Sequence, residues 1–321
     1  MSRSSALFSG AAVLAGMAGG ILVGKRWGIP FLSRDSDYAI SMYSGPSIGQ
    51  LGPMPGASNP VISARSVTDL PAQFVADPFL IKRGERWSLF FEVVDRRNGR
   101  GCIGHASSLD GRSWSYDQIV LSEPFHLSYP FVFEWEGEVY MVPESSERYE
   151  VRLYRARRFP DRWELVTSLL RGPYVDSTLF RWNERWWMFS GIGWGNLHLF
   201  HAEHLNGPWQ EHPNSPLIVA NDSVARPGGR VITENGKLLR FAQDDYPYYG
   251  RQLRAFEIDV LSPTNYVEHQ VPYSPLLVPG SDSWNRRGMH HLDAHQQEDG
   301  AWCASVDGFR SMLLFNGRRF L

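Results

Sequence analysis

The chain has 321 residues, of which 43% are hydrophobic and 21% are charged, so it can form one large domain or two ordinary ones. A formal net charge of -2 at pH 7 leaves no basic surplus, which argues against nucleic acid as a partner. Two cysteines, Cys102 and Cys303, are too few for a disulfide framework and lack the paired spacing of a zinc or redox motif.

The N-terminal segment differs from the rest of the chain. From Ala6 to Gly24 it carries no charge, and it matches the ~20 residues that a helix needs to cross a membrane. No small-residue cleavage site follows it, so an uncleaved anchor is favoured over a removed signal sequence. We therefore expect a single membrane pass within residues 1–32 and a globular domain in residues 33–321, on a side of the membrane that stays open.

A hairpin pattern recurs five times after this segment. Each copy combines an apolar strand, a short turn and a second strand rich in aromatic and β-branched residues. The copies cover residues 76–92, 128–144, 175–191, 225–244 and 289–307. Corresponding positions lie 47 to 64 residues apart, which is the length of a four-stranded propeller blade.

The stretches between the hairpins supply the remaining strands. A strand, turn and strand follow each of the first four copies, whereas only a short segment follows the fifth, and the missing pattern stands in residues 37–63. We therefore predict an all-β, five-bladed β-propeller whose N-terminal strands complete the last blade, preceded by the hydrophobic helix. Ring closure also removes exposed sheet edges. A β-sandwich is the alternative, but it does not explain a fivefold period.

The two ends of each hairpin meet at one end of the sheet. If the first strand of each copy is innermost, these ends gather at one mouth of the central channel. The pairs placed there are Asp77 with Glu92, Tyr129 with Glu144, Asp176 with Gly191, Arg226 with Gln243, and His290 with Asp307. Crowded carboxylates raise one another's pKa and lose hydration, which indicates a functional site. For any single acid, a structural role as acceptor of backbone N–H bonds is an equal alternative.

An Asp-Pro that opens the first blade, in "ADPF", resembles the glycosidase clan of arabinanases, β-xylosidases, levansucrases and invertases. The resemblance implies that Asp77 acts as base or nucleophile. It also implies a general acid, for which Glu144 in "VPES" is the candidate, and an inner-strand aspartate that tunes the acid, matched by Asp176 in "VDST". The chain departs from the clan pattern where Tyr129 opens the second blade in place of an aspartate, and where the candidate acid lies on the second blade instead of the third.

A second resemblance covers nearly all of the chain after the N-terminal segment. Phrases such as "EPFHLSYPFVFEW", "RFAQDDYPYYG" and "GMHHLDAH" resemble the N-terminal domain of plant glucosamine inositolphosphorylceramide transferases and its stand-alone bacterial relatives. In the plant proteins a separate exostosin-like domain carries glycosyl transfer, so we do not expect that chemistry from a chain that ends at Leu321. The resemblance implies a link to membrane-associated glycan or glycolipid metabolism, with a glycosyltransferase as a candidate partner.

Two functions are compatible with these patterns. The first is a glycoside hydrolase or transglycosidase that acts on a cell-envelope glycan or glycolipid through the catalytic candidates Asp77, Glu144 and Asp176. The second is a non-catalytic glycan-binding module that serves a separate glycosyltransferase, with aromatic side chains such as Trp194 and Tyr248 stacked on sugar faces. The candidate substrate-binding residues are Glu92, His126, Tyr129, Arg226, Gln243, Asp244, His290, His291 and Asp307.

The stretch "MHHLDAH" also permits a metal site. On a strand, His291, Asp293 and His295 share one face, and three such ligands can bind zinc or another divalent ion. We favour the alternative that His290 or His291 lines the channel while the others pack between blades. We therefore predict no cofactor and assign no metal, although an acid-lined channel would attract Ca²⁺ weakly.

Overall fold

The computed structural model describes residues 32–315, with side chains in residues 36–311. Contacts divide the chain into two compact units, Asp37–Arg310 and the terminal segments Met1–Ser36 with Ser311–Leu321. The ring of sheets belongs to the first unit. Within the described residues the helices are three single 3-10 turns: η1 (Ile48–Gln50), η2 (Ala64–Ser66) and η3 (Ser146–Arg148).

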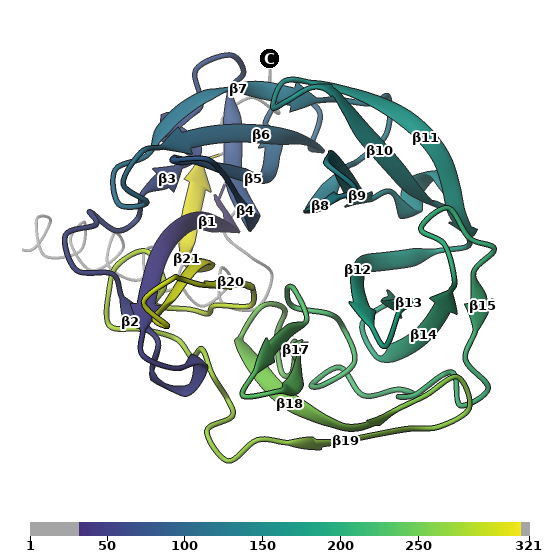
Figure 1. Cartoon of the computed structure of the whole chain (residues 1–321). Helices are drawn as coiled ribbons and strands as arrows, with labels where there is room; N and C mark the ends of the chain where they lie inside the picture. The colour runs from purple at the N-terminus through teal and green to yellow at the C-terminus, as the bar shows by residue number, and fades with distance from the viewer. Residues whose placement is uncertain (1–31, 316–321) are drawn as a thin grey trace, which may run out of the picture. The chain divides into compact units, whose positions relative to one another are not determined.

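Five antiparallel sheets are arranged in a ring, which confirms the predicted five-bladed β-propeller (Figure 1). From the inside of the ring outward, the first blade consists of β4 (Ala72–Arg83), β5 (Arg86–Asp95), β6 (Arg100–Ser108) and β7 (Ser115–Leu121), and the second of β8 (Ser128–Trp135), β9 (Glu138–Glu144), β10 (Glu150–Arg158) and β11 (Arg162–Arg171). The third blade consists of β12 (Tyr174–Trp182), β13 (Arg185–Ile192), β14 (Asn196–Ala202) and β15 (Gln210–Glu211). The fourth consists of β16 (Ile232–Glu234), β17 (Lys237–Asp244), β18 (Gln252–Leu261) and β19 (Tyr266–Gln270).

The fifth blade joins strands from both ends of the described chain. Its order is β20 (Leu292–Gln296), β21 (Trp302–Phe315), β1 (Leu32–Gly45) and β2 (Gly52–Pro53), and β3 (Ile62–Ser63) also pairs with β1. In Figure 1 the purple strand β1 lies beside the yellow strand β21. The N-terminal strands therefore complete the last blade, as the sequence predicts.

Tight turns fix the register of the inner hairpins. Two-residue turns join β8 to β9, β12 to β13 and β16 to β17, and both residues of each turn have positive φ: Glu136 and Gly137, Asn183 and Glu184, Asn235 and Gly236. Positive φ at both positions is the type I′ geometry, whose twist matches that of the flanking strands. Because the turns fix the register at one end, the other ends of the paired strands meet at the mouth.

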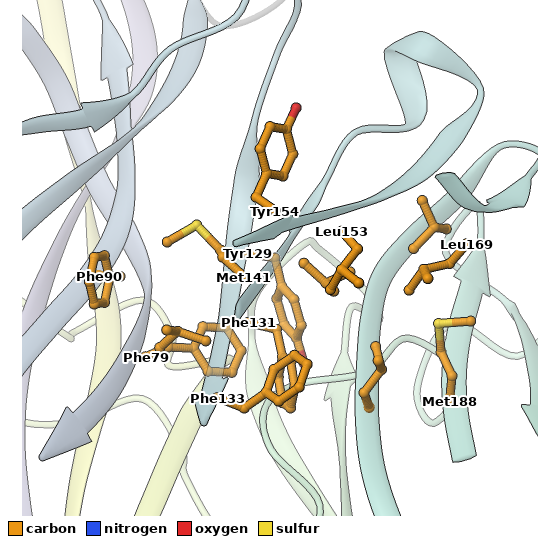
Figure 2. Close-up of a cluster of buried hydrophobic side chains, with 14 of the residues drawn as sticks. Phe79, Phe90, Tyr129, Phe131, Phe133, Met141, Leu153, Tyr154, Leu169 and Met188 are labelled. Atoms are coloured by element: carbon orange, nitrogen blue, oxygen red, sulfur yellow. The ribbon is translucent and has the colours of Figure 1, made fainter. Parts of the chain in front are cut away.

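Aromatic side chains fill the space between the first and second blades. Phe79 of β4 packs edge-on against Tyr129 and Phe131 of β8, with ring centroids 4.8 and 5.5 Å apart (Figure 2). The contact continues to the third blade, where the rings of Phe133 and Trp186 lie 5.7 Å apart. Large buried rings supply much of the apolar area that holds neighbouring blades together.

An ion pair links four blades deeper in the channel. Arg230 Nε donates to Asp293 Oδ1 at 2.7 Å, and Nη2 of the same arginine donates to the Val132 carbonyl at 2.8 Å. The second oxygen of Asp293 accepts from the Leu80 N–H at 2.6 Å and from His295 Nε2 at 3.0 Å. Burial alone would raise the pKa of Asp293, but Arg230 and His295 hold it below its usual value. The Asp293 carboxylate is therefore ionised and fully paired.

The predicted membrane location is wrong for the part of the chain that the structure describes. No helix within residues 32–315 is long and apolar enough to cross a membrane, since each is a single 3-10 turn and a span needs ~20 residues. The predicted N-terminal helix is likewise not supported, and its segment from Ala6 to Gly24 lies outside the described residues.

We expect Asp293→Ala to lower the free energy of unfolding by about 3–5 kcal/mol, because it leaves the Arg230 guanidinium without its buried partner. Chemical denaturation followed by tryptophan fluorescence measures the change. The control is Asp161→Ala, which removes the partner of the exposed Arg158 and should have a much smaller effect. Equal losses in the two variants would contradict a stabilising role for the Asp293 ion pair.

Candidate functional site

Three inner strands each carry one left-handed residue away from the turn that joins the strand to the next, and we call the end of the ring where these residues lie the mouth. Asp77 in β4, Tyr129 in β8 and Asp176 in β12 have φ values of 52°, 44° and 51°. Each lies where the pairing with the next strand shifts register, as in a β-bulge. This conformation is strained for a residue other than glycine, and bulges next to functional sites redirect side chains. Its repetition in three blades indicates a constraint on the mouth.

The first cluster at the mouth joins Asp77 to the fifth blade. Asp307 of β21 accepts the Asp77 N–H at 3.1 Å, the His291 N–H at 3.1 Å and Nδ1–H of His290 at 2.7 Å. Nε2 of His290 then lies 3.7 Å from Asp77 Oδ1 and 3.3 Å from the Tyr249 hydroxyl. Within the described residues, that buried Asp77 oxygen has no hydrogen-bond partner.

Burial and charge set different protonation states in this cluster. Burial lowers the pKa of His290, but Asp307 and Asp77 outweigh it and raise the pKa to about 9. Burial lowers the pKa of His291 to about 4, and its Nε2 donates to the Pro78 carbonyl at 3.1 Å. Burial raises the pKa of Asp77 well above its usual value, although the charge of His290 opposes the shift. A carboxyl with a raised pKa therefore lies beside an imidazole whose pKa is also raised.

The second cluster joins the third and fourth blades. Arg226 Nε donates to Asp176 Oδ2 at 2.5 Å, and Gln243 Nε2 donates to the same oxygen at 2.9 Å. Burial would lower the pKa of Arg226, but Asp176 outweighs it, so the pKa is raised well above its usual value. The guanidinium also lies over the Tyr249 ring, 5.2 Å from its centroid. Among the described side chains, Asp176 Oδ1 and Gln243 Oε1 are buried acceptors without a partner.

Glu144 and Glu92, the acids that end two of the hairpins, are also buried. Glu144 accepts the Ser146 N–H at 2.7 Å and the Ser128 hydroxyl at 3.2 Å, and burial raises its pKa. Glu92 Oε1 lies 3.0 Å from Nε2 of His126. Burial lowers the pKa of His126, but the hydrogen bond to Glu92 outweighs it and raises the pKa. His126, with 34% of its side chain exposed, places an imidazole at the rim, and its Nδ1 accepts the Gly101 N–H at 2.9 Å.

The side chains of two predicted binding residues, Tyr129 and Asp244, make hydrogen bonds within the protein. The Tyr129 hydroxyl accepts the Gly229 N–H at 2.8 Å and shares a hydrogen bond of 2.7 Å with the Thr178 hydroxyl, which ties three blades together. Asp244 lies within the fourth blade, where it accepts from Arg254 Nε at 2.9 Å. Both residues are 0% exposed, and these partners hold their polar groups inside the protein.

Residues 49–309 of the chain match a known protein family. The family is described as "Glucosamine inositolphosphorylceramide transferase 1, N-terminal". The chain belongs to this family. The match extends through the five blades, which confirms the resemblance stated from the sequence.

Two plant relatives carry the same name. The chain is 38% identical over 300 residues to glucosamine inositolphosphorylceramide transferase 1 of Oryza sativa subsp. japonica, an alignment that covers 86% of this chain and 40% of the relative. It is 37% identical over 298 residues to the Arabidopsis thaliana protein, covering 88% of this chain and 39% of that one. The chain thus spans about 40% of the length of the curated relatives that it matches.

Solved structures share the fold at low sequence identity. A glycosyl hydrolase from Bacteroides ovatus aligns with a TM-score of 0.58 and 12% identity, covering 78% of this chain and 92% of that chain. The β-1,2-mannobiose phosphorylase of Listeria innocua gives 0.59 and 13%, covering 83% and 96%. A mutant of the Cellvibrio cellulosa α-L-arabinanase gives 0.55 and 16%, covering 74% and 90%. At these identities the likeness shows a common propeller fold.

The sequence analysis missed three residues at the mouth of the propeller: Tyr38, Asp245 and Tyr249. Asp245 Oδ1 accepts the Gly250 N–H at 2.7 Å, its Oδ2 has no partner within the described residues, and burial raises its pKa. The Tyr38 ring lies 5.2 Å from the His290 ring. The acidic and aromatic run "QDDYPYYG" is a signal for Asp245 and Tyr249. Tyr38 has none, since it reaches the mouth only through β1.

The described residues bring two groups of three possible metal ligands within 4.8 Å of one another: Asp77, His290 and Asp307 at the mouth, and Glu257, Asp259 and His269 on the fourth blade. At the mouth, a charged His290 has no lone pair for a metal, so an ion would have to displace its proton. His291, Asp293 and His295, which the sequence offered as possible metal ligands, are engaged with other groups. Asp293 pairs with Arg230, and His291 donates to the Pro78 carbonyl.

We expect His290 to titrate near pH 9 in an NMR titration of the imidazoles, with the signal assigned by its loss in His290→Gln. Because the pKa is raised on folding, the protonated form stabilises the fold fully below about pH 6.5, and that contribution is lost as the pH rises through about 9. In Asp307→Asn burial dominates, and the midpoint should fall below 6.5. A wild-type midpoint at or below 6.5 would contradict the His290–Asp307 ion pair.

Proposed function

We propose that the mouth is the active site of a glycoside hydrolase or transglycosidase. The observation that carries the proposal is a pair of buried carboxyl groups in different surroundings. Burial raises the pKa of Asp77 well above its usual value and one of its oxygens has no partner among the described residues, whereas Asp176 is paired with the Arg226 guanidinium. Glycoside cleavage by two carboxyl groups needs one of them protonated and the other ionised at neutral pH.

In this proposal Asp77 is the general acid that protonates the glycosidic oxygen. The resemblance to the glycosidase clan implies a base or nucleophile at this position. A buried carboxyl with a strongly raised pKa is better suited to donate a proton than to accept one. Asp176 then supplies the negative charge that stabilises the positive charge developing at the anomeric carbon. Glu144, which is held by two hydrogen bonds, binds a sugar hydroxyl or shares the acid role.

The proposed substrate is a cell-envelope glycan or glycolipid. Membership of a family named after a glucosamine inositolphosphorylceramide transferase supports this class. Relatives of the fold that are named glycosyl hydrolase, phosphorylase and arabinanase are consistent with glycan chemistry in a propeller mouth. The unpaired oxygens of Asp77, Asp176 and Gln243 are acceptors, and a polyhydroxylated ligand supplies the matching donors.

A second function, a glycan-binding module without catalysis, is favoured by one observation. The chain matches only about 40% of the length of relatives whose name describes a transferase, so their chemistry can belong to the part that this chain does not match. The buried acids would then shape a binding site for a glycan, and a separate glycosyltransferase would act on it.

A mass-spectrometric turnover screen of the protein against oligosaccharides and glycolipid headgroups tests the proposal. We expect product from the wild-type protein, and a loss of about 10²–10⁴-fold in rate in Asp77→Asn because the general acid is removed. Asp176→Asn should also lose activity, since Arg226 is left without its charged partner. Glu298→Gln, an exposed carboxylate in the β20–β21 turn at the opposite end of that hairpin from His290 and Asp307, is the matched control and should keep the wild-type rate.

The outcomes separate the two functions. Turnover that persists unchanged in both Asp77→Asn and Asp176→Asn would overturn the assignment of the active site. Absence of product, with glycan retained equally by the wild-type protein and both variants, would favour the binding module.

A further inference from the structure

A cavity of about 350 Å³ lies between the second and third blades at the end of the ring opposite the mouth. Its lining includes Trp135 at the end of β8, Trp186 at the start of β13 and residues 203–206 after β14. These positions adjoin the β8–β9 and β12–β13 turns, whereas Asp77 lies in the middle of β4 and Asp176 near the start of β12. We name this the seam cavity. It shares no side chain with the mouth.

The seam cavity has an aromatic wall with a guanidinium on it. The rings of Trp135 and Trp186 meet edge to face at 5.1 Å, and the Arg181 guanidinium lies 4.6 and 6.0 Å from their centroids. Arg181 is exposed, and within residues 36–311 its side chain makes no hydrogen bond or ion pair. The N–H donors of Arg181 are thus held in place by the rings and remain free for a ligand.

Two carboxylates in the lining carry the opposite charge. Glu136 and Glu203 are exposed, and the side-chain amide of Asn206 also lines the cavity. Glu203 lies 3.8 Å from the Arg185 guanidinium and keeps 76% of its side chain exposed, so that contact leaves most of its capacity as an acceptor free. An anionic ligand would meet two carboxylates, and a cationic ligand would meet Arg181. The mixture favours a neutral ligand that donates and accepts hydrogen bonds.

We propose that the seam cavity is a second glycan-binding site that holds a neutral sugar residue. A sugar combines an apolar face, which fits the indole wall, with hydroxyls that both donate and accept. Arg181 donates to ring or hydroxyl oxygens, and Glu203 and Glu136 accept from hydroxyls. A volume of about 350 Å³ lies at the lower end of the range for small-molecule sites, as expected for one or two sugar units. The site binds without catalysis and does not depend on the function of the mouth.

Titration with neutral disaccharides tests the seam cavity. The probes are cellobiose, mannobiose and arabinobiose, followed by saturation-transfer NMR and by the indole N–H signals of the protein. We expect binding of at least one probe, weakened about tenfold in Arg181→Gln and in Trp135→Ala and also weakened in Glu203→Gln. Glu184→Gln is the matched control, because this exposed carboxylate lies in the β12–β13 turn but outside the lining. If Trp135→Ala fails to fold, Arg181→Gln carries the test.

The same titration in Asp77→Asn separates the two sites. Affinity that is unchanged in Asp77→Asn and reduced in Arg181→Gln supports a seam site, whether or not the mouth proves to be catalytic. Affinity that falls only in Asp77→Asn places the sugar at the mouth and overturns the inference. Failure to bind any of the three probes, an equal loss in Glu184→Gln, or tighter binding of galacturonic acid or glucosamine also overturns it.

Discussion

Closure of the ring by β1 against β21 is the constraint on which the rest of the structure depends. It brings five inner strands around one channel, so charged residues near the ends of these strands are buried together. An unpaired buried charge is costly, and each ionised group in the channel accordingly has a partner of opposite sign. The ion pairs are Asp307 with His290, Asp176 with Arg226, and Asp293 with Arg230. The first pair lies within the hairpin of the fifth blade, and the other two join neighbouring blades.

Buried polar groups at two depths of the ring differ in whether they have hydrogen-bond partners. Deeper in the ring, both oxygens of Asp293 and the Tyr129 hydroxyl have partners. At the mouth, by contrast, Asp77, Asp176 and Gln243 each keep a buried acceptor without a partner among the described residues. An unsatisfied buried group costs about 1–3 kcal/mol, and the left-handed backbone at Asp77 and Asp176 adds strain. Unpaired acceptors and strained backbone together at Asp77 and Asp176, next to the paired Asp293 and Tyr129, are typical of a site shaped for a ligand.

The sequence predicted the blades and most of the mouth because hairpin geometry converts spacing into proximity. Two ends of a hairpin must meet, so Asp77 with Glu92 and His290 with Asp307 followed from the repeat alone. Asp244 was misplaced at the channel, since adjacent strand residues face opposite sides and Gln243 already occupied the inner one. Tyr38 and the left-handed conformations depend on ring closure and bulges, which no local pattern encodes. The membrane helix rested on composition alone, and the described structure gives it no support.

If both proposals hold, the distance between the two sites governs how they cooperate. β12 carries both Asp176 and Arg181, five residues apart, and at ~3.3 Å per residue this spacing separates mouth and seam by roughly 17 Å. A glycan shorter than this distance occupies one site at a time. A longer one can be held at the seam while its end enters the mouth, which raises its effective concentration there without any change of conformation. Such tethering raises local concentration through the length of the glycan, so it needs no second conformation of the hydrogen-bonded blade between the sites.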